Sequence, residues 1–245
     1  MRQFSKKLRN IIPSQIKKPF NFIYSSILEI DEPRRLKKFY SQFLKKGDLV
    51  FDIGANKGLH TKIFLDLDCR VVAVEPNPEL VNKLNNKFGK KIVLVDKGIG
   101  PKNDVMDFKM FLEDGHSTFY KNNPKLVNQY LYKTIPLQVI TLNNLIEQYG
   151  KPSFIKIDVE GFEYNVLKTL KFPTTVVFEF TSSIFDVAIK CIEHLNKIGN
   201  AKFNYTYSIN HKLELNKWVS GEELVNLLKK STPHLFGDIV VRFKK

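Results

Sequence analysis

The chain has 245 residues, 43% of them hydrophobic, and a formal net charge of +14. This composition excludes a disordered or collagen-like chain, and the length predicts one large domain or one domain with an appendage. The two cysteines, Cys69 and Cys191, lie in apolar segments. We expect buried thiols in a reducing compartment, with neither a disulfide framework nor a zinc cluster.

The N-terminal residues are the most basic part of the chain. Residues 1–50 contain twelve Lys and Arg against four Asp and Glu, a net +8, and the other 195 residues contribute +6. Prolines interrupt the loosely helical spacing, which predicts a basic helical appendage over residues 1–46. The charge fits either a solvated face or a polyanionic neighbour: an anionic membrane surface, an acidic glycan or nucleic acid.

The apolar side chains of this appendage allow two interpretations. They could insert into an anionic membrane surface, or they could cap the sheet of the following domain. The longest uncharged stretch near the N-terminus, residues 19–28, has about half the length that crosses a bilayer, and no secretory signal is evident. We expect a cytoplasmic protein, free or at the inner face of a membrane. The side chains are Phe4, Leu8, Ile11, Ile12, Phe20, Phe22 and Ile23.

From residue 47 to residue 245 the sequence alternates β-branched apolar runs with amphipathic stretches. This rhythm predicts an α/β fold, a doubly wound, mostly parallel sheet of about seven strands covered on both faces. Predicted strands are 49–53, 70–75, 91–96, 154–158, 175–180, 202–209 and 237–243. Three predicted helices span residues 78–88, 184–198 and 220–230. Another ends near residue 67, and two more begin at residues 141 and 163.

The stretch from about residue 101 to residue 140 breaks this rhythm. Residues 105–110 and 135–140 alternate like half-exposed strands around a polar loop. We expect an inserted β-hairpin or a pair of edge strands, with the loop over residues 114–125 near the active site.

The first predicted strand runs into a glycine-bearing turn that opens a helix. The sequence there is Val-Phe-Asp-Ile-Gly-Ala-Asn-Lys-Gly over residues 50–58. Gly54 allows the backbone to turn and approach a ligand, Gly58 allows close helix packing, and Asn56 tolerates positive φ. The helix N–H groups beyond the turn face the same place. This pattern predicts a nucleotide-like ligand, and a purely structural turn is the alternative.

Glu75 ends the next predicted strand, 21 residues after Gly54. An acidic side chain there can accept hydrogen bonds from ribose hydroxyls. A dinucleotide site prefers G-x-G-x-x-G, whereas this turn reads G-x-N-x-G, so a nicotinamide enzyme is disfavoured. The two features together indicate an adenosine-containing cofactor without a pyrophosphate.

These motifs resemble those of a known family. Residues 52–58 and Val-Glu-Pro-Asn-Pro at 74–78 resemble the first two motifs of class I methyltransferases that use S-adenosylmethionine. Phe-Ile-Lys-Ile-Asp-Val-Glu-Gly-Phe-Glu at 154–163 resembles the signature of the FkbM type. The resemblance covers about residues 47–180 and implies a Rossmann-like domain that methylates a hydroxyl, often on a sugar, glycolipid or polyketide.

The resemblance also implies a cofactor site. The glycine turn would wrap the methionine part, Glu75 would hold the ribose, and the end of the third strand would lie by the adenine. His60 and Lys97 depart from the residues that the family often has at their positions. The implied cofactor residues are Asp52, Gly54, Ala55, Asn56, Gly58, His60, Thr61, Glu75, Pro76, Asp96, Lys97 and Ser117.

Three carboxylates, Asp158, Glu160 and Glu163, follow a buried strand at the sheet edge where ligands bind. Glu163 suits a structural role at a helix start. Asp158 or Glu160 could take the proton of an acceptor hydroxyl, or join Glu179 in binding a divalent cation such as Mg²⁺. His116, on a glycine-marked loop, is the other candidate base.

The sequence therefore predicts an S-adenosylmethionine-dependent O-methyltransferase acting on a sugar hydroxyl of a surface glycan or glycolipid precursor. One alternative is an RNA 2′-O-methyltransferase that uses the +14 charge to bind phosphate. The other is a binding protein that keeps the fold without turnover. Fold alone does not select the acceptor.

Overall fold

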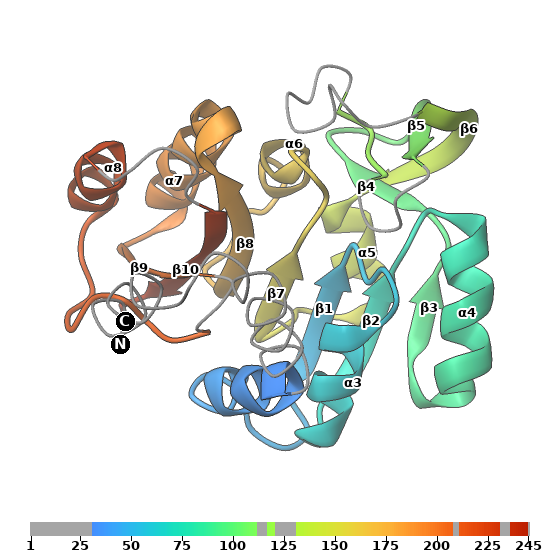
Figure 1. Cartoon of the computed structure of the whole chain (residues 1–245), viewed down its shortest axis with the longest axis horizontal. Coiled ribbons are helices and arrows are strands. Elements are labelled where there is room, and N and C mark those ends of the chain that lie inside the picture. The colour runs from blue at the N-terminus through green and yellow to red at the C-terminus, as the bar shows by residue number, and fades with distance from the viewer. Residues whose placement is uncertain (1–30, 112–116, 121–130, 208–210, 231–235, 245) are drawn as a thin grey trace, which may run out of the picture.

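The computed structural model describes residues 31–111, 117–120, 131–207, 211–230 and 236–244. It contains a seven-stranded sheet between two layers of helices and a separate three-stranded sheet at one end (Figure 1). The predicted α/β class and strand number are confirmed. His116 and the apolar side chains of residues 1–30 discussed above lie outside the described residues.

The main sheet has the order β3-β2-β1-β7-β8-β10-β9. β1, β2, β3, β7 and β8 run parallel, and β10 lies antiparallel between β8 and β9. The chain leaves β1 in one direction and returns on its other side at β7, which makes this pair a topological switch point. The strands are β1 Leu49–Ile53, β2 Arg70–Val74, β3 Val93–Val95, β7 Phe154–Ile157, β8 Thr175–Thr181, β9 Ala201–Tyr207 and β10 Phe236–Phe243.

Both faces of the sheet are buried, as continuous apolar strands require. On β1, Val50 packs into one core cluster, while Phe51 and Ile53 pack into the other. Helix 31–40, α3 and α4 cover the first face, and α5, α6, α7 and α8 cover the second. The helices are α3 Leu59–Asp66, α4 Pro78–Phe88, α5 Leu142–Tyr149, α6 Glu163–Leu167, α7 Phe185–Ile198 and α8 Gly221–Lys229.

Several helix boundaries have local causes. The Asn77 side chain accepts a hydrogen bond from the N–H of Glu79 at the start of α4, and Thr141 accepts one in the same way at the start of α5. Ser220 and Glu223 form a reciprocal capping box at the start of α8. The strand predicted over 91–96 is only Val93–Val95 because residues 89–91 form a turn of 3-10 helix.

The segment predicted as an inserted hairpin forms a sheet of its own. β5 Asp104–Phe111 and β6 Leu131–Thr141 pair antiparallel, and β4 Gly98–Gly100 joins β6 in parallel. Phe119 joins this sheet to the main domain, because its ring lies 4.8 Å from that of Phe108 and 5.8 Å from that of Phe162. The small sheet therefore stands over the carboxyl ends of the main strands (Figure 1).

Helix 31–40 is part of the core. Leu36, Phe39 and Tyr40 are each at most 1% exposed and pack with α3 and β7. Helix 31–40, which the sequence placed in the appendage, therefore packs against the main sheet. Whether the apolar side chains of residues 4–23 cap the sheet or insert into a membrane stays a prediction, because they lie outside the described residues. None of the helices in the described ranges has the length and apolar character needed to cross a bilayer.

Candidate functional site

A cavity of about 300 Å³ opens at the carboxyl ends of β1, β2 and β7, next to the switch point. The structure brings ten of the predicted site residues into its wall. Asp52, Gly58, Thr61, Asp96 and Glu179 are not in the wall. The ten are Gly54, Ala55, Asn56, His60, Glu75, Pro76, Lys97, Ser117, Asp158 and Glu160.

The turn after β1 needs glycine at two positions. Gly54 has φ +84°, and a Cβ there would lie 1.9 Å from the carbonyl oxygen of Asp158. Gly58 has φ +76°, and a Cβ there would lie 2.4 Å from the ring of Phe88 on α4. The first glycine lets β1 and β7 approach at the cavity, and the second lets α3 begin against α4.

Glu75 joins two turns. Its Oε2 accepts a hydrogen bond from the N–H of Asn56 at 2.8 Å, and its Oε1 accepts one from the N–H of Asn77 at 2.9 Å. The side chain is 4% exposed, and burial raises its pKa to about 7. Each oxygen retains a second lone pair, so the carboxylate can still accept from the hydroxyls of a ribose.

Asp52 lies beneath the turn and is 1% exposed. It accepts a hydrogen bond of 2.5 Å from the Thr61 hydroxyl on α3. Burial raises its pKa to about 6. This hydrogen bond ties β1 to α3. Both residues therefore hold the turn in place without lining the cavity themselves.

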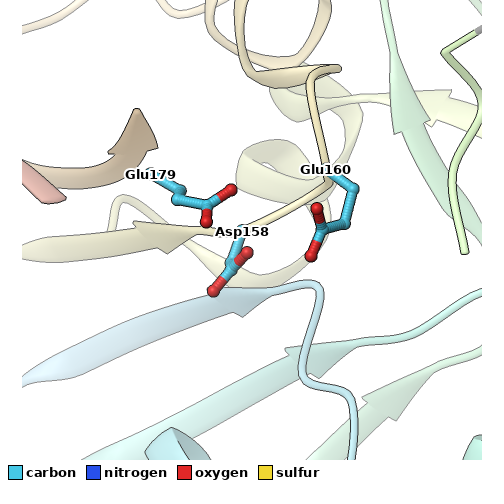
Figure 2. Close-up of side chains that lie close together, drawn as sticks. All are labelled: Asp158, Glu160 and Glu179. Atoms are coloured by element: carbon cyan, nitrogen blue, oxygen red, sulfur yellow. The ribbon is translucent and has the colours of Figure 1, made fainter. Parts of the chain in front are cut away.

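Three carboxylates converge beside the cavity (Figure 2). Asp158 and Glu160 follow β7, Glu179 lies on β8, and one oxygen atom from each lies within 4.8 Å of the others. Glu160 has φ +53°, and Gly161 beside it has φ +95°. Asp158 and Glu160 line the cavity, so the group lies between the turn after β1 and the end of β8.

A buried lysine stands behind Asp158. Lys156 is 1% exposed, and its ammonium group lies 3.3 Å from Asp158 and 3.0 Å from Asp238 on β10. Burial opposes the charge of Lys156, yet the two aspartates hold its pKa well above the ordinary value. In turn, the ammonium group favours the carboxylate form of Asp158.

The loop that carries Glu160 is held from both sides. The Thr118 hydroxyl donates hydrogen bonds to the carbonyls of Val159 and Glu160, each at 3.1 Å. Glu163 accepts from the N–H groups of Val159 and Gly161, so its role in the structure is that of a loop brace. The segment that follows β5 thus contributes to the position of the carboxylates.

The end of the third strand contributes one of its two predicted residues to the cavity. Asp96 is exposed, while its neighbour Lys97 lines the cavity. The sequence reasoning also missed three buried polar residues that contact the site, namely Tyr40, Thr118 and Asp238. An acidic residue before Ile-Val-Val in the last strand was a signal for Asp238.

Comparison with known proteins gives relatives at the sequence and structure levels. Hexuronic acid methyltransferase AglP of Haloferax volcanii is 27% identical over 129 residues, which are 51% of this chain and 50% of that protein. The match thus spans about half of either protein. Precorrin-6y C5,15-methyltransferase of Geobacter metallireducens has a TM-score of 0.44 at 14% identity, over 86% of this chain and 87% of that one.

A second solved structure is an O-methyltransferase of Bacillus cereus, with a TM-score of 0.43 at 10% identity, over 95% of this chain and 92% of that one. The sequence model described as "Methyltransferase FkbM domain" matches residues 52–220, more than half of the chain and all of the site except Asp238 and Tyr40. The chain therefore belongs to the FkbM methyltransferase domain family.

Proposed function

We propose that the chain transfers a methyl group from S-adenosylmethionine to a hydroxyl of a sugar in a surface glycan or glycolipid precursor. The observation that carries the proposal is the position of the carboxylates of Asp158 and Glu160 in the wall of the cavity, close to Glu179. A site for a cofactor and a site for a proton acceptor therefore share one cavity.

The residues around the cavity fit the cofactor. Gly54 lets β1 and β7 approach each other at the cavity, because a Cβ there would collide with the carbonyl oxygen of Asp158, and the buried Glu75 offers carboxylate lone pairs to ribose hydroxyls. Lys97 and Gly98 line the cavity between the end of β3 and the small sheet. S-adenosylmethionine, when bound, supplies an activated methyl group and no pyrophosphate, in keeping with the short turn.

The chain's own task is to place a hydroxyl and remove its proton. The oxygen–carbon bond forms as the carbon–sulfur bond breaks, and the hydroxyl proton passes to a carboxylate. We assign this role to Asp158, because it lines the cavity and its carboxylate is held 3.3 Å from the ammonium group of Lys156. Positioning of the two reactants supplies most of the remaining acceleration.

The negative charge of the three carboxylates indicates which class of methyl acceptor the site favours. Three carboxylates suit a neutral, hydroxyl-rich ring, to which they can offer several hydrogen-bond acceptors. The name of the relative AglP includes a hexuronic acid, whose carboxylate would have to point away from them. RNA remains the alternative, and the +14 charge of the chain favours it. The three carboxylates would, however, repel the phosphates of RNA at this site.

A second candidate role for the same carboxylates is to bind a divalent cation. One oxygen each from Asp158, Glu160 and Glu179 lies within 4.8 Å of the others, and hard cations prefer such oxygen ligands. A cation there would acidify the acceptor hydroxyl. Turnover after removal of metal with EDTA, and after return of Mg²⁺, separates this role from direct proton transfer.

The test is turnover by the Asp158→Asn variant. The change keeps the size of the side chain and removes its basicity, so kcat should fall by about 10² to 10⁴. The dissociation constant of S-adenosylmethionine, measured by calorimetry, should change little. Asp186→Asn removes a carboxylate that is 63% exposed and paired with Lys190, and it should leave both quantities unchanged.

The acceptor panel contains neutral hexosides, hexuronosides and RNA at two salt concentrations. Methylation of RNA that falls steeply with salt would favour the RNA alternative over the sugar. Wild-type turnover on any acceptor excludes the non-catalytic alternative.

Asp158→Asn turnover close to that of the wild type would contradict the assignment of Asp158 as the base. An anionic membrane partner for residues 1–30 stays a prediction, which vesicle flotation tests.

A further inference from the structure

The cavity receives a contact from the part of the chain that precedes the family match. The hydroxyl of Tyr40, on helix 31–40, lies 3.0 Å from Nδ1 of His60. Tyr40 is 0% exposed, and its ring packs edge-on against Phe64 and Phe154, at 4.8 and 5.6 Å between ring centroids. The position of the phenol is therefore set by the core.

His60 is the second residue of α3 and lines the cavity. Burial lowers its pKa to about 4, and burial raises the pKa of Tyr40 well above its ordinary value. Both groups are therefore neutral at pH 7. A neutral imidazole carries its proton on one nitrogen only, so the contact with Tyr40 decides what the other nitrogen can do.

The direction of this hydrogen bond follows from burial. Within the described part of the chain, the Tyr40 hydroxyl has His60 as its hydrogen-bond partner and no other. If Nδ1 donated to the phenol oxygen, the phenol proton would be buried without an acceptor, which costs about 1–3 kcal/mol. The phenol therefore donates to Nδ1, and the imidazole proton resides on Nε2.

We propose that Tyr40 is a positioning residue that fixes this tautomer of His60, so that Nε2–H donates to the carboxylate of bound S-adenosylmethionine. A carboxylate is the strongest acceptor that the cofactor carries, and a fixed donor in the cavity wall would select for it. The inference rests on the proposed placement of the cofactor in this cavity. It makes helix 31–40 a contributor to cofactor recognition.

The test is a double-mutant cycle measured by calorimetry with S-adenosylmethionine, S-adenosylhomocysteine and 5′-methylthioadenosine, which lacks the amino-acid part. Tyr40→Phe removes the hydroxyl alone and should weaken binding of the first two about three- to tenfold. His60→Ala should weaken them about tenfold or more. Binding of 5′-methylthioadenosine should change less than twofold in either variant. In the His60→Ala background, Tyr40→Phe should have no further effect.

A matched control is Tyr205→Phe, which removes another hydroxyl from a largely buried tyrosine, 9% exposed and outside the cavity wall. Its cofactor affinity should equal that of the wild type. Equal losses from Tyr40→Phe in both backgrounds, or an equal loss for 5′-methylthioadenosine, would overturn the proposal. Failure of the wild type to bind S-adenosylmethionine would instead overturn the proposed cofactor site.

A spectroscopic measurement does not depend on affinity. Nitrogen-15 NMR of histidine-labelled protein distinguishes protonated from unprotonated ring nitrogens, and His60→Ala identifies the signal of His60. The wild type should show a proton on Nε2, and Tyr40→Phe should show a mixture of tautomers. A proton on Nδ1 in the wild type would refute the assigned hydrogen bond.

Discussion

Glu75 shows how one side chain can serve structure and ligand together. Its carboxylate accepts hydrogen bonds from backbone N–H groups on two turns, yet it is almost completely buried. Burial raises its pKa to about 7, so the protein without cofactor holds a mixture of the acid and the carboxylate at neutral pH. Ribose hydroxyls donate to the carboxylate form, which is the form that should bind.

We therefore predict that cofactor affinity depends on pH through Glu75. Affinity should be full from about one pH unit above 7 and should fall as pH decreases, by at most about tenfold per pH unit, because protonation must be reversed for binding. Calorimetric titrations from about pH 5.5 to 8.5 measure this dependence. Asp52, whose pKa is raised to about 6, titrates in the same range, so a variant is needed to isolate Glu75.

Glu75→Gln provides that variant. It should bind the cofactor about tenfold more weakly at about pH 7.5, because the amide offers the ribose a poorer acceptor. The ratio of wild-type to variant affinity should shrink as pH falls, because the wild-type side chain becomes neutral too. A ratio that stays constant over the whole pH range would show that the ionised form of Glu75 does not contribute to binding.

Individual site residues differ in how far the sequence reveals them. Gly54, Glu75 and Asp158 each end a strand in a local motif, so a short window is enough to find them. Tyr40 lies 20 positions from His60, and Asp238 lies 82 positions from Lys156, so these contacts exist only in the folded domain. Spacing within a motif carries no information about such contacts.

At the scale of elements, the turn between β1 and α3 determines how closely β7 can approach. Gly54→Ala combines a strained left-handed backbone with a Cβ placed 1.9 Å from the Asp158 carbonyl oxygen. We expect a loss of cofactor binding and a fall in stability clearly larger than the roughly 1–2 kcal/mol due to φ alone. Chemical denaturation and calorimetry measure the two effects.

Gly47→Ala is a control that separates the cost of the positive φ from the steric clash of the added Cβ. Gly47 has the same φ of +84°, but a Cβ there would meet nothing within 4 Å. This variant should lose only the stability that the positive φ costs an alanine, and it should bind the cofactor like the wild type. Equal destabilisation by the two substitutions would mean that β7 can move away from the turn without cost.

The small sheet shows a limit of prediction from sequence at this scale. The alternating pattern located β5 and β6, because half-exposed strands leave a period of two. It did not locate β4, which has only three residues, two of them glycine. A Cβ at Gly98 would lie 2.5 Å from the ring of Phe119, so β4 is specified by close packing and not by periodicity.

At the scale of the whole molecule, helix 31–40 belongs to the folded domain. Phe39 is 1% exposed and sits in the core cluster that lies under α3. Phe39→Ala should therefore destabilise the protein by about 3–5 kcal/mol. Urea denaturation measures this loss, with Phe236→Ala as the control because Phe236 is 49% exposed. Similar losses for both variants would place helix 31–40 outside the cooperative unit.

The position of β10 has a consequence for how the protein is made. β10 is synthesised after β9 but inserts between β8 and β9, and it carries the Asp238 carboxylate that neutralises Lys156. Until residue 238 leaves the ribosome, β8 has an open edge and the buried lysine lacks one of its two counter-ions. A nascent chain should therefore acquire its cofactor only late in translation, and until then it offers chaperones an unpaired strand edge.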